Sequence, residues 1–394
     1  MQTLFRDRIQ SIDLLRGIVM VVMALDHCRD FFHYGFFSTS PTDLETTTPI
    51  LFFTRFITHY CAPTFVFLSG TSAFLYGAKK TKKELCKFLL TRGLWLIFVE
   101  FFVNTFLWSF DLSYRYFNLQ VLWAIGMSMI AMSGLIFLPL NAILGISSLF
   151  LLGHNLLDGI RMQGNDFAAV MWYIFHQTSS IEISENHGIN FFYPVAPWTS
   201  IMALGYCLGK LYTSDFDAAR RKSWLRYLGF GAILFFIVLR GLNIYGDPLP
   251  WSAQKNAVFT VLSFLKLSKY PPSLSFALAT LGPGLLFLSV SEQFKNSITR
   301  FFVVFGNVPF FYYLMHMLFI HLFAMLGLVV TGQDWRMMIL DETAFSSDRL
   351  ANYGYSLFVV YLVWIALILF LYPFCRKYML YKSANRDSWW LSYL

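Results

Sequence analysis

The stretch RIQSIDLLRGIVMVVMALDHCRDFFH, at residues 8–33, decides the fold class. From Ile12 onward it is mostly apolar over about 20 residues, the length with which a helix crosses a bilayer. It nevertheless carries ionisable side chains, which are costly in hydrocarbon and are functional candidates by default. The run lacks a small-x-small cleavage pattern, so we expect a retained first helix rather than a signal peptide.

The composition extends this expectation to the whole chain. Of 394 residues, 57% are hydrophobic and 13% are charged, whereas soluble domains carry about 25% charged residues. Aromatic residues make up 19% of the chain, and such an excess fits Trp and Tyr rings at lipid headgroups. The net charge of +8 comes from short clusters between apolar runs. That pattern is typical of membrane orientation, so we expect no nucleic-acid partner.

The apolar stretches of spanning length predict the architecture. They lie at 12–33, 49–77, 85–110, 118–138, 140–157, 194–212, 224–244, 272–290, 307–330 and 353–375. The sequence therefore predicts an all-α, polytopic integral membrane helix bundle of about ten transmembrane helices, forming a single domain over residues 1–394. It shows no internal repeat of the kind from which many transporters are built.

The basic clusters predict the orientation of these helices. They follow the second and sixth stretches and fill the C-terminal tail: Lys79, Lys80, Lys82, Lys83 and Lys87, then Arg220, Arg221, Lys222 and Arg226, then Arg376, Lys377, Lys382 and Arg386. With ten spans all three clusters lie on the side of the N-terminus, which the positive-inside rule makes cytoplasmic. We therefore expect both termini in the cytoplasm, with long outward loops at about 154–193 and 331–352.

One face of the first span carries functional side chains at steps of three and four residues. These are Asp13, Arg16, Met20, Met23, His27 and Asp30. Arg16 and His27 are separated by roughly 16 Å along the helix. A cation at the inner mouth and an imidazole deeper in the bilayer suit a long, phosphorylated donor. The alternative is that His27 is only a hydrogen-bonded packing residue.

Later spans add further candidates. Arg55 and His59 lie one turn apart in the second span, where an interfacial anchor is the competing interpretation. Arg92 stands at the inner end of the third span, where it either binds phosphate or marks the interface. In the ninth stretch, Gly306-Asn307-Val308-Pro309 predicts an interruption with a helix restarting at Pro309. Tyr312 and His316 then share one face.

An ordered set of motifs carries a resemblance to a known family. The opening has the spacing R-x4-D-x2-R-G-x9-H from Arg8 to His27, and further matches run to His316: APTFVFLSG at 62–70, LWAIG at 122–126, YP and APW within 193–198, KYPPSL at 269–274 and YLMH at 313–316. The chain resembles the transmembrane acyltransferase superfamily, in its bacterial branch related to heparan-alpha-glucosaminide N-acetyltransferase. The resemblance implies a catalytic role for His27, an acyl-CoA role for Arg8 and Arg16, and the bacterial cytoplasmic (inner) membrane as location.

These observations combine into one functional hypothesis. An acetyl group passes from cytoplasmic acetyl-CoA to a sugar amine or hydroxyl, in an amino sugar or glycan on the far side. His27 serves as general base or acyl carrier. Asp30 is expected to reach His27 directly along the helix. Further candidates for the catalytic site are Asp26, His316 and His59. The candidates for binding the acyl-CoA donor are Arg8, Arg16 and Arg92. His33 and His59 stay open as alternative bases.

The hypothesis includes no metal. The 5 cysteines are scattered without a CxxC pair, and HExxH is absent from the sequence. The rival class is a proton-coupled transporter with a relay of Asp13, Asp26, His27, Glu100 and His316, which leaves the ordered motifs unexplained. Beyond membrane lipid and substrates, the sequence leaves the oligomeric state open, with a homodimer among the options.

Overall fold

The computed structural model describes residues 9–35, 39–341, 348–350, 353–385, 388 and 391. Arg8, named above as a donor-binding residue, lies outside the described residues. The chain forms two compact units, each built from separated segments. The first unit comprises Met1–Cys61, Asn104–Arg115 and Ser291–Leu394, and the second comprises Ala62–Val103 and Tyr116–Val290. The single integral domain over residues 1–394 stays a prediction.

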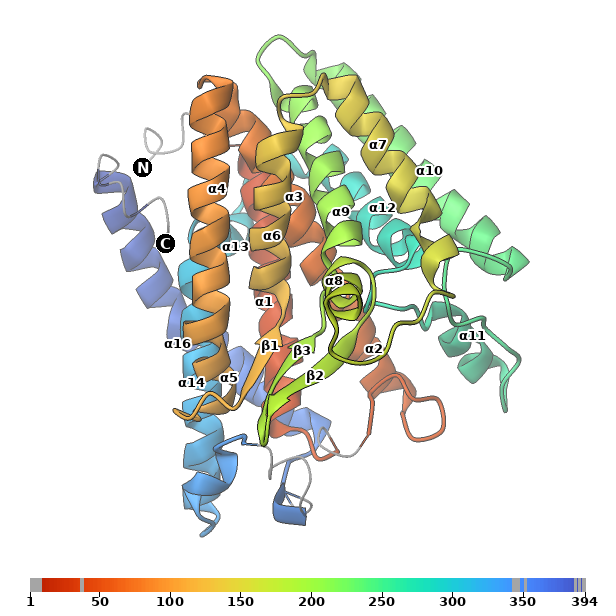
Figure 1. The fold of residues 1–394 in the computed structure, drawn as a ribbon. Coiled ribbons are helices and arrows are strands. Elements are labelled where there is room, and N and C mark those ends of the chain that lie inside the picture. The colour runs from red at the N-terminus through yellow and green to blue at the C-terminus, as the bar shows by residue number, and fades with distance from the viewer. Residues whose placement is uncertain are drawn as a thin grey trace. The chain divides into compact units, whose positions relative to one another are not determined.

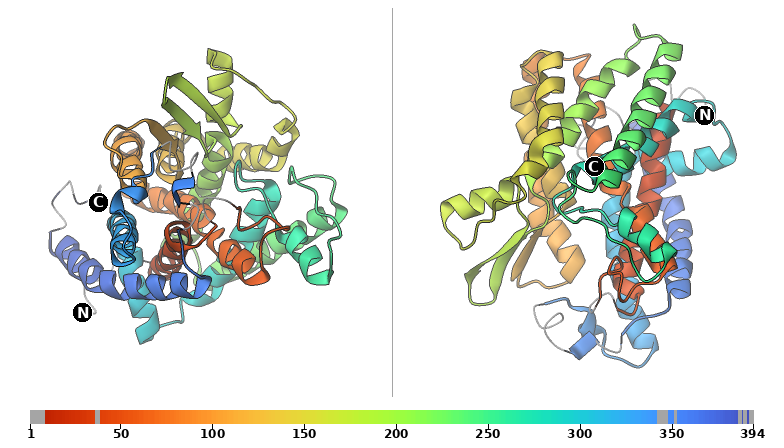
Figure 2. Two further views of the ribbon diagram at one scale, coloured as in Figure 1. Left: turned by 90° about the horizontal axis from the view of Figure 1, so that it is seen from below. Right: turned by 90° about the vertical axis from the view of Figure 1, so that its right-hand side faces the viewer.

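The first unit is a helical bundle around its first helix. It contains α1 (Gln10–Phe32), α2 (Pro49–Thr58), α5 (Thr105–Ser109), α13 (Ser297–Asn307), α14 (Pro309–Val330) and α16 (Leu357–Ala384), with short 3-10 turns at Trp335–Met338 and Asp348–Leu350. α1 packs against α2, α13, α14 and α16, and the red α1 lies beside the blue α14 and α16 in the end-on view (Figure 2, left).

Burial of α1 is nearly complete around its circumference. Between Ser11 and Phe32 the side chains that are only half-buried are Arg16, Ile18, Val22 and His27. The stripe predicted from the helical spacing therefore faces protein, but so do the other faces of the helix. A helix that is mainly apolar on all sides is buried at the centre of its bundle.

The second unit combines helices with a small sheet. Its helices are α3 (Cys61–Gly77), α4 (Lys82–Phe98), α6 (Val121–Leu135), α7 (Leu140–Gly153), α8 (Phe167–Phe175), α9 (Val195–Leu208), α10 (Ala218–Leu242), α11 (Ala257–Leu265) and α12 (Leu274–Ser291). A π-helical turn, Val99–Asn104, prolongs α4, and 3-10 turns η3 (His154–Leu157) and η4 (Gly209–Tyr212) follow α7 and α9. α4 runs beside α6, while α6 and α7 both pack on α9 (Figure 1).

The three-stranded sheet is an element that the all-α prediction omitted. β3 (His187–Phe191) lies between β1 (Tyr116–Leu119), to which it is parallel, and β2 (Ser179–Ser184), to which it is antiparallel. With α8, the β2–β3 hairpin gives regular structure to the segment predicted as the outward loop 154–193. The alternating Ile181 and Ile183 in β2 were the available strand signal.

The apolar stretches predicted from the sequence coincide in position with helices of the structure. Each of the ten overlaps at least one described helix. Within the described residues, six helical segments are long and apolar enough to cross a membrane: Pro49–Gly77, Leu140–Leu157, Ala218–Leu242, Leu274–Ser291, Pro309–Val330 and Leu357–Ala384. These make the chain an integral membrane protein, while the count of about ten spans and the orientation stay predictions. The predicted break is confirmed, because α13 ends at Asn307 and α14 begins at Pro309.

The contact between α1 and α13 brings two backbones together. A Cβ atom added to Gly306 would lie 1.8 Å from the carbonyl oxygen of Asp13, and one added to Gly17 would lie 1.9 Å from that of Phe302. No side chain fits at such a distance, so both positions require glycine. Small residues of this kind allow close helix approach in membranes, where packing drives association.

We predict that Gly306→Ala destabilises the protein by about 1–3 kcal/mol or more, since overpacking forces the backbones apart. Gly231→Ala is the matched control, because a Cβ atom at Gly231 in α10 meets nothing within 4 Å. Thermal unfolding of both variants in the same detergent measures the difference. Equal melting temperatures for the two variants would contradict the role given to this contact.

Candidate functional site

Two histidines meet in the first unit. His27 of α1 and His316 of α14 are far apart in sequence, yet His27 Nδ1 lies 2.7 Å from His316 Nε2. Their rings stack with centroids 5.0 Å apart and an interplanar angle of 18°. His316 is fully buried and His27 is half-buried. The structure thus brings together the two histidines that the sequence motifs singled out.

The hydrogen-bond partners of the two imidazoles indicate which ring nitrogens carry a proton. His316 Nδ1 lies 3.0 Å from the main-chain oxygen of Tyr312, and because a carbonyl only accepts, Nδ1 donates. In the neutral ring, His316 Nε2 then accepts, so His27 Nδ1 is the donor between the two histidines. This assignment leaves the lone pair of neutral His27 on Nε2.

The Tyr312 carbonyl, His316 and His27 form a chain of hydrogen bonds that orients the His27 ring. A hydrogen bond at one imidazole nitrogen fixes the tautomer and orientation of the ring, as it does in catalytic triads. Here the main-chain carbonyl of Tyr312 orients His316, and His316 orients His27. The arrangement suits His27 Nε2 either to take a proton or to attack a carbonyl carbon.

Aromatic side chains surround the His27 ring. Trp108 of α5 meets it edge-on with ring centroids 5.1 Å apart, and Tyr313 does so at 6.3 Å. The Tyr313 hydroxyl donates to Asn104 Oδ1 over 3.0 Å. Within the described part of the chain, the buried indole Nε1 of Trp108 has no hydrogen-bond partner. Trp108 was not predicted from the sequence, because a tryptophan in an apolar run carries no ionisable signal.

The two acids nearest His27 in sequence pair with arginines. Arg29 Nη1 lies 2.7 Å from Asp26 Oδ1, and Arg29 Nη2 lies 2.5 Å from Asp30 Oδ1. Asp26 also accepts hydrogen bonds from Arg55 and, over 2.9 Å, from Thr58 Oγ1. The expected direct contact of Asp30 with His27 is therefore replaced by an ion pair with Arg29. A buried carboxylate needs a charged, hydrogen-bonding partner, which guanidinium supplies better than a neutral imidazole.

The alternative bases lie at the ends of their helices. His59 is the buried residue that follows α2, and its ring centroid is 6.2 Å from that of Phe56. His33 follows α1 and stacks on Tyr34 at 4.5 Å. A small hollow of about 10 Å³ opens beside His33, and it is lined by Arg29, His33, Gly35, Thr39, Pro41 and Leu51.

The predicted donor-binding arginines fall in different places. Arg16 lies near the start of α1, where its Nη1 is 3.0 Å from Asp13 Oδ1 and 3.4 Å from the Gly306 carbonyl oxygen. Arg92 belongs to α4 of the second unit and is half-buried. Arg16 and His27 share α1, so their separation of roughly 16 Å along the helix is kept.

A third histidine, His321 of α14, bridges two main-chain carbonyl groups. His321 Nδ1 lies 2.9 Å from the Leu107 carbonyl oxygen and Nε2 lies 2.8 Å from that of Met338. The ring thus links α14 to α5 and to the Trp335–Met338 turn. The sequence motifs singled out His316, which sits close by on the same helix, and not this bridging histidine.

Comparison with known proteins decides the family. A family model described as "Heparan-alpha-glucosaminide N-acetyltransferase, catalytic" matches residues 8–246, more than half of the chain. The chain belongs to this family. No curated protein matches it.

Membership of this N-acetyltransferase family confirms the resemblance drawn from the motifs, and it implies a membrane acetyltransferase. The matched residues include His27, Asp26, Asp30, His59, Arg16 and Arg92. His316 lies beyond the matched range, so its link to the site comes from the geometry of the first unit.

Proposed function

We propose that this protein transfers an acetyl group from acetyl-CoA to the amine or hydroxyl of a sugar, with His27 acting on the reacting bond. The observation that carries the proposal is the His27–His316 hydrogen bond of 2.7 Å, which leaves the lone pair of neutral His27 on Nε2. The family supports acetyl transfer as the class of reaction. Donor, acceptor and residue roles are our inference.

Two routes use the same nitrogen. In the direct route, Nε2 takes the proton from the acceptor as its oxygen or nitrogen attacks the thioester carbon. The C–S bond then breaks, and coenzyme A leaves as a thiolate that takes up a proton. In the carrier route, Nε2 itself attacks that carbon, the C–S bond breaks, and coenzyme A leaves as a thiolate. The acceptor then attacks the acetyl carbon, the C–N bond to the imidazole breaks, and the acceptor's proton passes to the freed Nε2.

The neighbours of His27 support both routes. His316 Nε2 accepts from His27 Nδ1–H, so it stabilises the ring when His27 becomes positively charged. The indole N–H of Trp108, buried and without a partner in the part of the chain that the structure describes, is a candidate donor to the thioester oxygen.

The transporter hypothesis gains no support from these contacts. A relay needs acids that accept and release protons, whereas two acids of the proposed relay, Asp13 and Asp26, are each held by an arginine. Nor does that hypothesis account for the family match. Acetyl transfer therefore remains the favoured function.

For topology we propose about ten spans, with both termini on the cytoplasmic side of a bacterial inner membrane. The basic clusters support this orientation. A cysteine at Lys82 should react with a membrane-impermeant maleimide only after cells are permeabilised, while one at Asn165 should react in intact cells. Labelling of residue 82 from outside would overturn the orientation and the cytoplasmic origin of the donor.

For the donor we propose phosphate binding by Arg8, Arg16 and Arg92. Charge-assisted hydrogen bonds contribute about 1.5–3 kcal/mol each, so Arg16→Ala should weaken acetyl-CoA binding by about tenfold or more. Arg220→Ala is the control, because Arg220 is an exposed residue at the start of α10. Isothermal titration with acetyl-CoA measures both. Equal affinity in the two variants would remove Arg16 from the donor site.

The decisive prediction concerns catalysis. His27→Ala should lower turnover of labelled acetyl-CoA with amino-sugar acceptors by about 10²–10⁴-fold, because the general base or carrier is lost. His316→Ala should lower kcat less and should alter the pH dependence of kcat, since it orients His27 and does not touch the substrate. Acetyl-CoA affinity should stay near the wild-type value in both.

The controls separate the alternatives. His187 is exposed on β3, and His187→Ala should be fully active. If His27→Ala keeps near-normal turnover while His33→Ala or His59→Ala is inactive, the base is misassigned although the enzyme class survives. Normal transfer by all of these variants would rule out histidine chemistry.

A further inference from the structure

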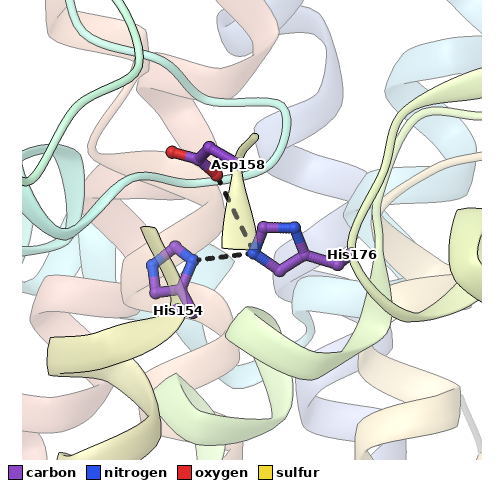
Figure 3. Close-up of side chains that lie close together, drawn as sticks. All are labelled: His154, Asp158 and His176. Carbon is purple, nitrogen blue, oxygen red and sulfur yellow. Dashed lines mark hydrogen bonds and ion pairs between the residues drawn. The ribbon is translucent and has the colours of Figure 1, made fainter. Parts of the chain in front are cut away.

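Three potential metal ligands meet in the second unit, outside the site described above. His154 begins η3 at the end of α7, Asp158 follows η3, and His176 follows α8. The ligand atoms of the three side chains lie within 4.8 Å of one another, and Figure 3 shows the side chains converging. His154 Nδ1 is 3.2 Å from His176 Nε2, which is 3.9 Å from Asp158 Oδ1.

A neighbouring amide orients the carboxylate. Asn155 Nδ2 donates to Asp158 Oδ2 over 2.8 Å, while Asn155 Oδ1 accepts from the main-chain N–H of Leu274 over 2.9 Å. Both ends of the amide are therefore fixed, and the other carboxylate oxygen, Oδ1, is the one nearest His176. Metal sites commonly hold their ligands through an outer layer of hydrogen bonds of this kind.

Hydrogen bonding within the cluster is incomplete. The 3.9 Å between Asp158 Oδ1 and His176 Nε2 exceeds hydrogen-bond distance. His154 and His176 are both buried. Two imidazoles and a carboxylate that meet in a buried place without full hydrogen bonding between them are incompletely compensated for their desolvation.

The spacing of the ligand atoms fits a tetrahedral cation. Zinc with bonds of about 2.0–2.1 Å to nitrogen separates its ligand atoms by about 3.3 Å. The His154–His176 distance of 3.2 Å already matches, whereas Asp158 Oδ1, which is 3.9 Å from His176 Nε2, has to move closer to both imidazoles. Two imidazoles and one carboxylate form a donor set that zinc accepts, with water in the fourth position.

We propose that His154 Nδ1, His176 Nε2 and Asp158 Oδ1 bind a zinc ion. The ion joins the end of α7 to the chain that leads from α8 into β2, so it stabilises the second unit. It has no part in the chemistry proposed for His27. The sequence predicted no metal, because it contains neither a CxxC pair nor HExxH, and this spacing of His, Asp and His is not a standard motif.

The test measures metal content and affinity in the full-length protein, purified in detergent through a tag without histidines. After chelation and zinc addition, the wild type should retain about one zinc per chain by elemental analysis. His176→Ala and Asp158→Asn should each bind zinc at least tenfold more weakly. His187→Ala should match the wild type, because His187 is exposed and outside the cluster.

Two further measurements keep the test decisive. Cobalt added to the chelated wild type should give the visible spectrum of a tetrahedral site with nitrogen and oxygen ligands, and His176→Ala should lose it. Zinc should raise the melting temperature of the wild type but not that of Asp158→Asn. The proposal is overturned if the wild type binds no zinc at micromolar concentrations, or if the ligand variants bind it as tightly as the wild type.

Discussion

The close contact between α1 and α13 is the constraint on which the first unit depends. At Gly17 and Gly306 the two backbones lie too close to admit a Cβ atom. One residue separates the end of α13 from the start of α14, so this contact also fixes where α14 begins relative to α1. The position of His316 opposite His27 therefore depends on a pair of glycines away from the reacting groups.

The ionisable side chains of α1 divide into two kinds of environment. Toward its C-terminal end, Arg29 forms ion pairs with Asp26 and Asp30, and Arg55 of α2 pairs with Asp26. Each charge finds an opposite charge there, which offsets the cost of leaving water. His27 instead faces an imidazole and aromatic rings. These ion pairs thus stabilise the buried charges of α1. His27, the candidate base, has the imidazole of His316 as its hydrogen-bond partner.

Much of this arrangement was predictable from the sequence, and the exceptions have physical causes. Hydropathy located the helices because a spanning segment must satisfy its own backbone hydrogen bonds. Helical spacing showed that Asp30 lies near His27 on the helix surface. It did not show that the Asp30 carboxylate pairs with Arg29 in place of His27. The pairing of His154 with His176 depends on how the chain returns after α8, and the parallel pairing of β1 with β3 joins distant segments. Periodicity within one segment carries no information about such long-range partners.

The separation of His27 and His316 in the chain has a consequence for biosynthesis. The two residues are 289 positions apart, and the second unit is encoded between them. At about 5–20 residues per second, a ribosome needs roughly 15–60 s to add that intervening length. His27 therefore enters the membrane well before its partner exists. The nascent chain carries an unoriented imidazole until α14 is made, so the candidate site is completed only late in translation.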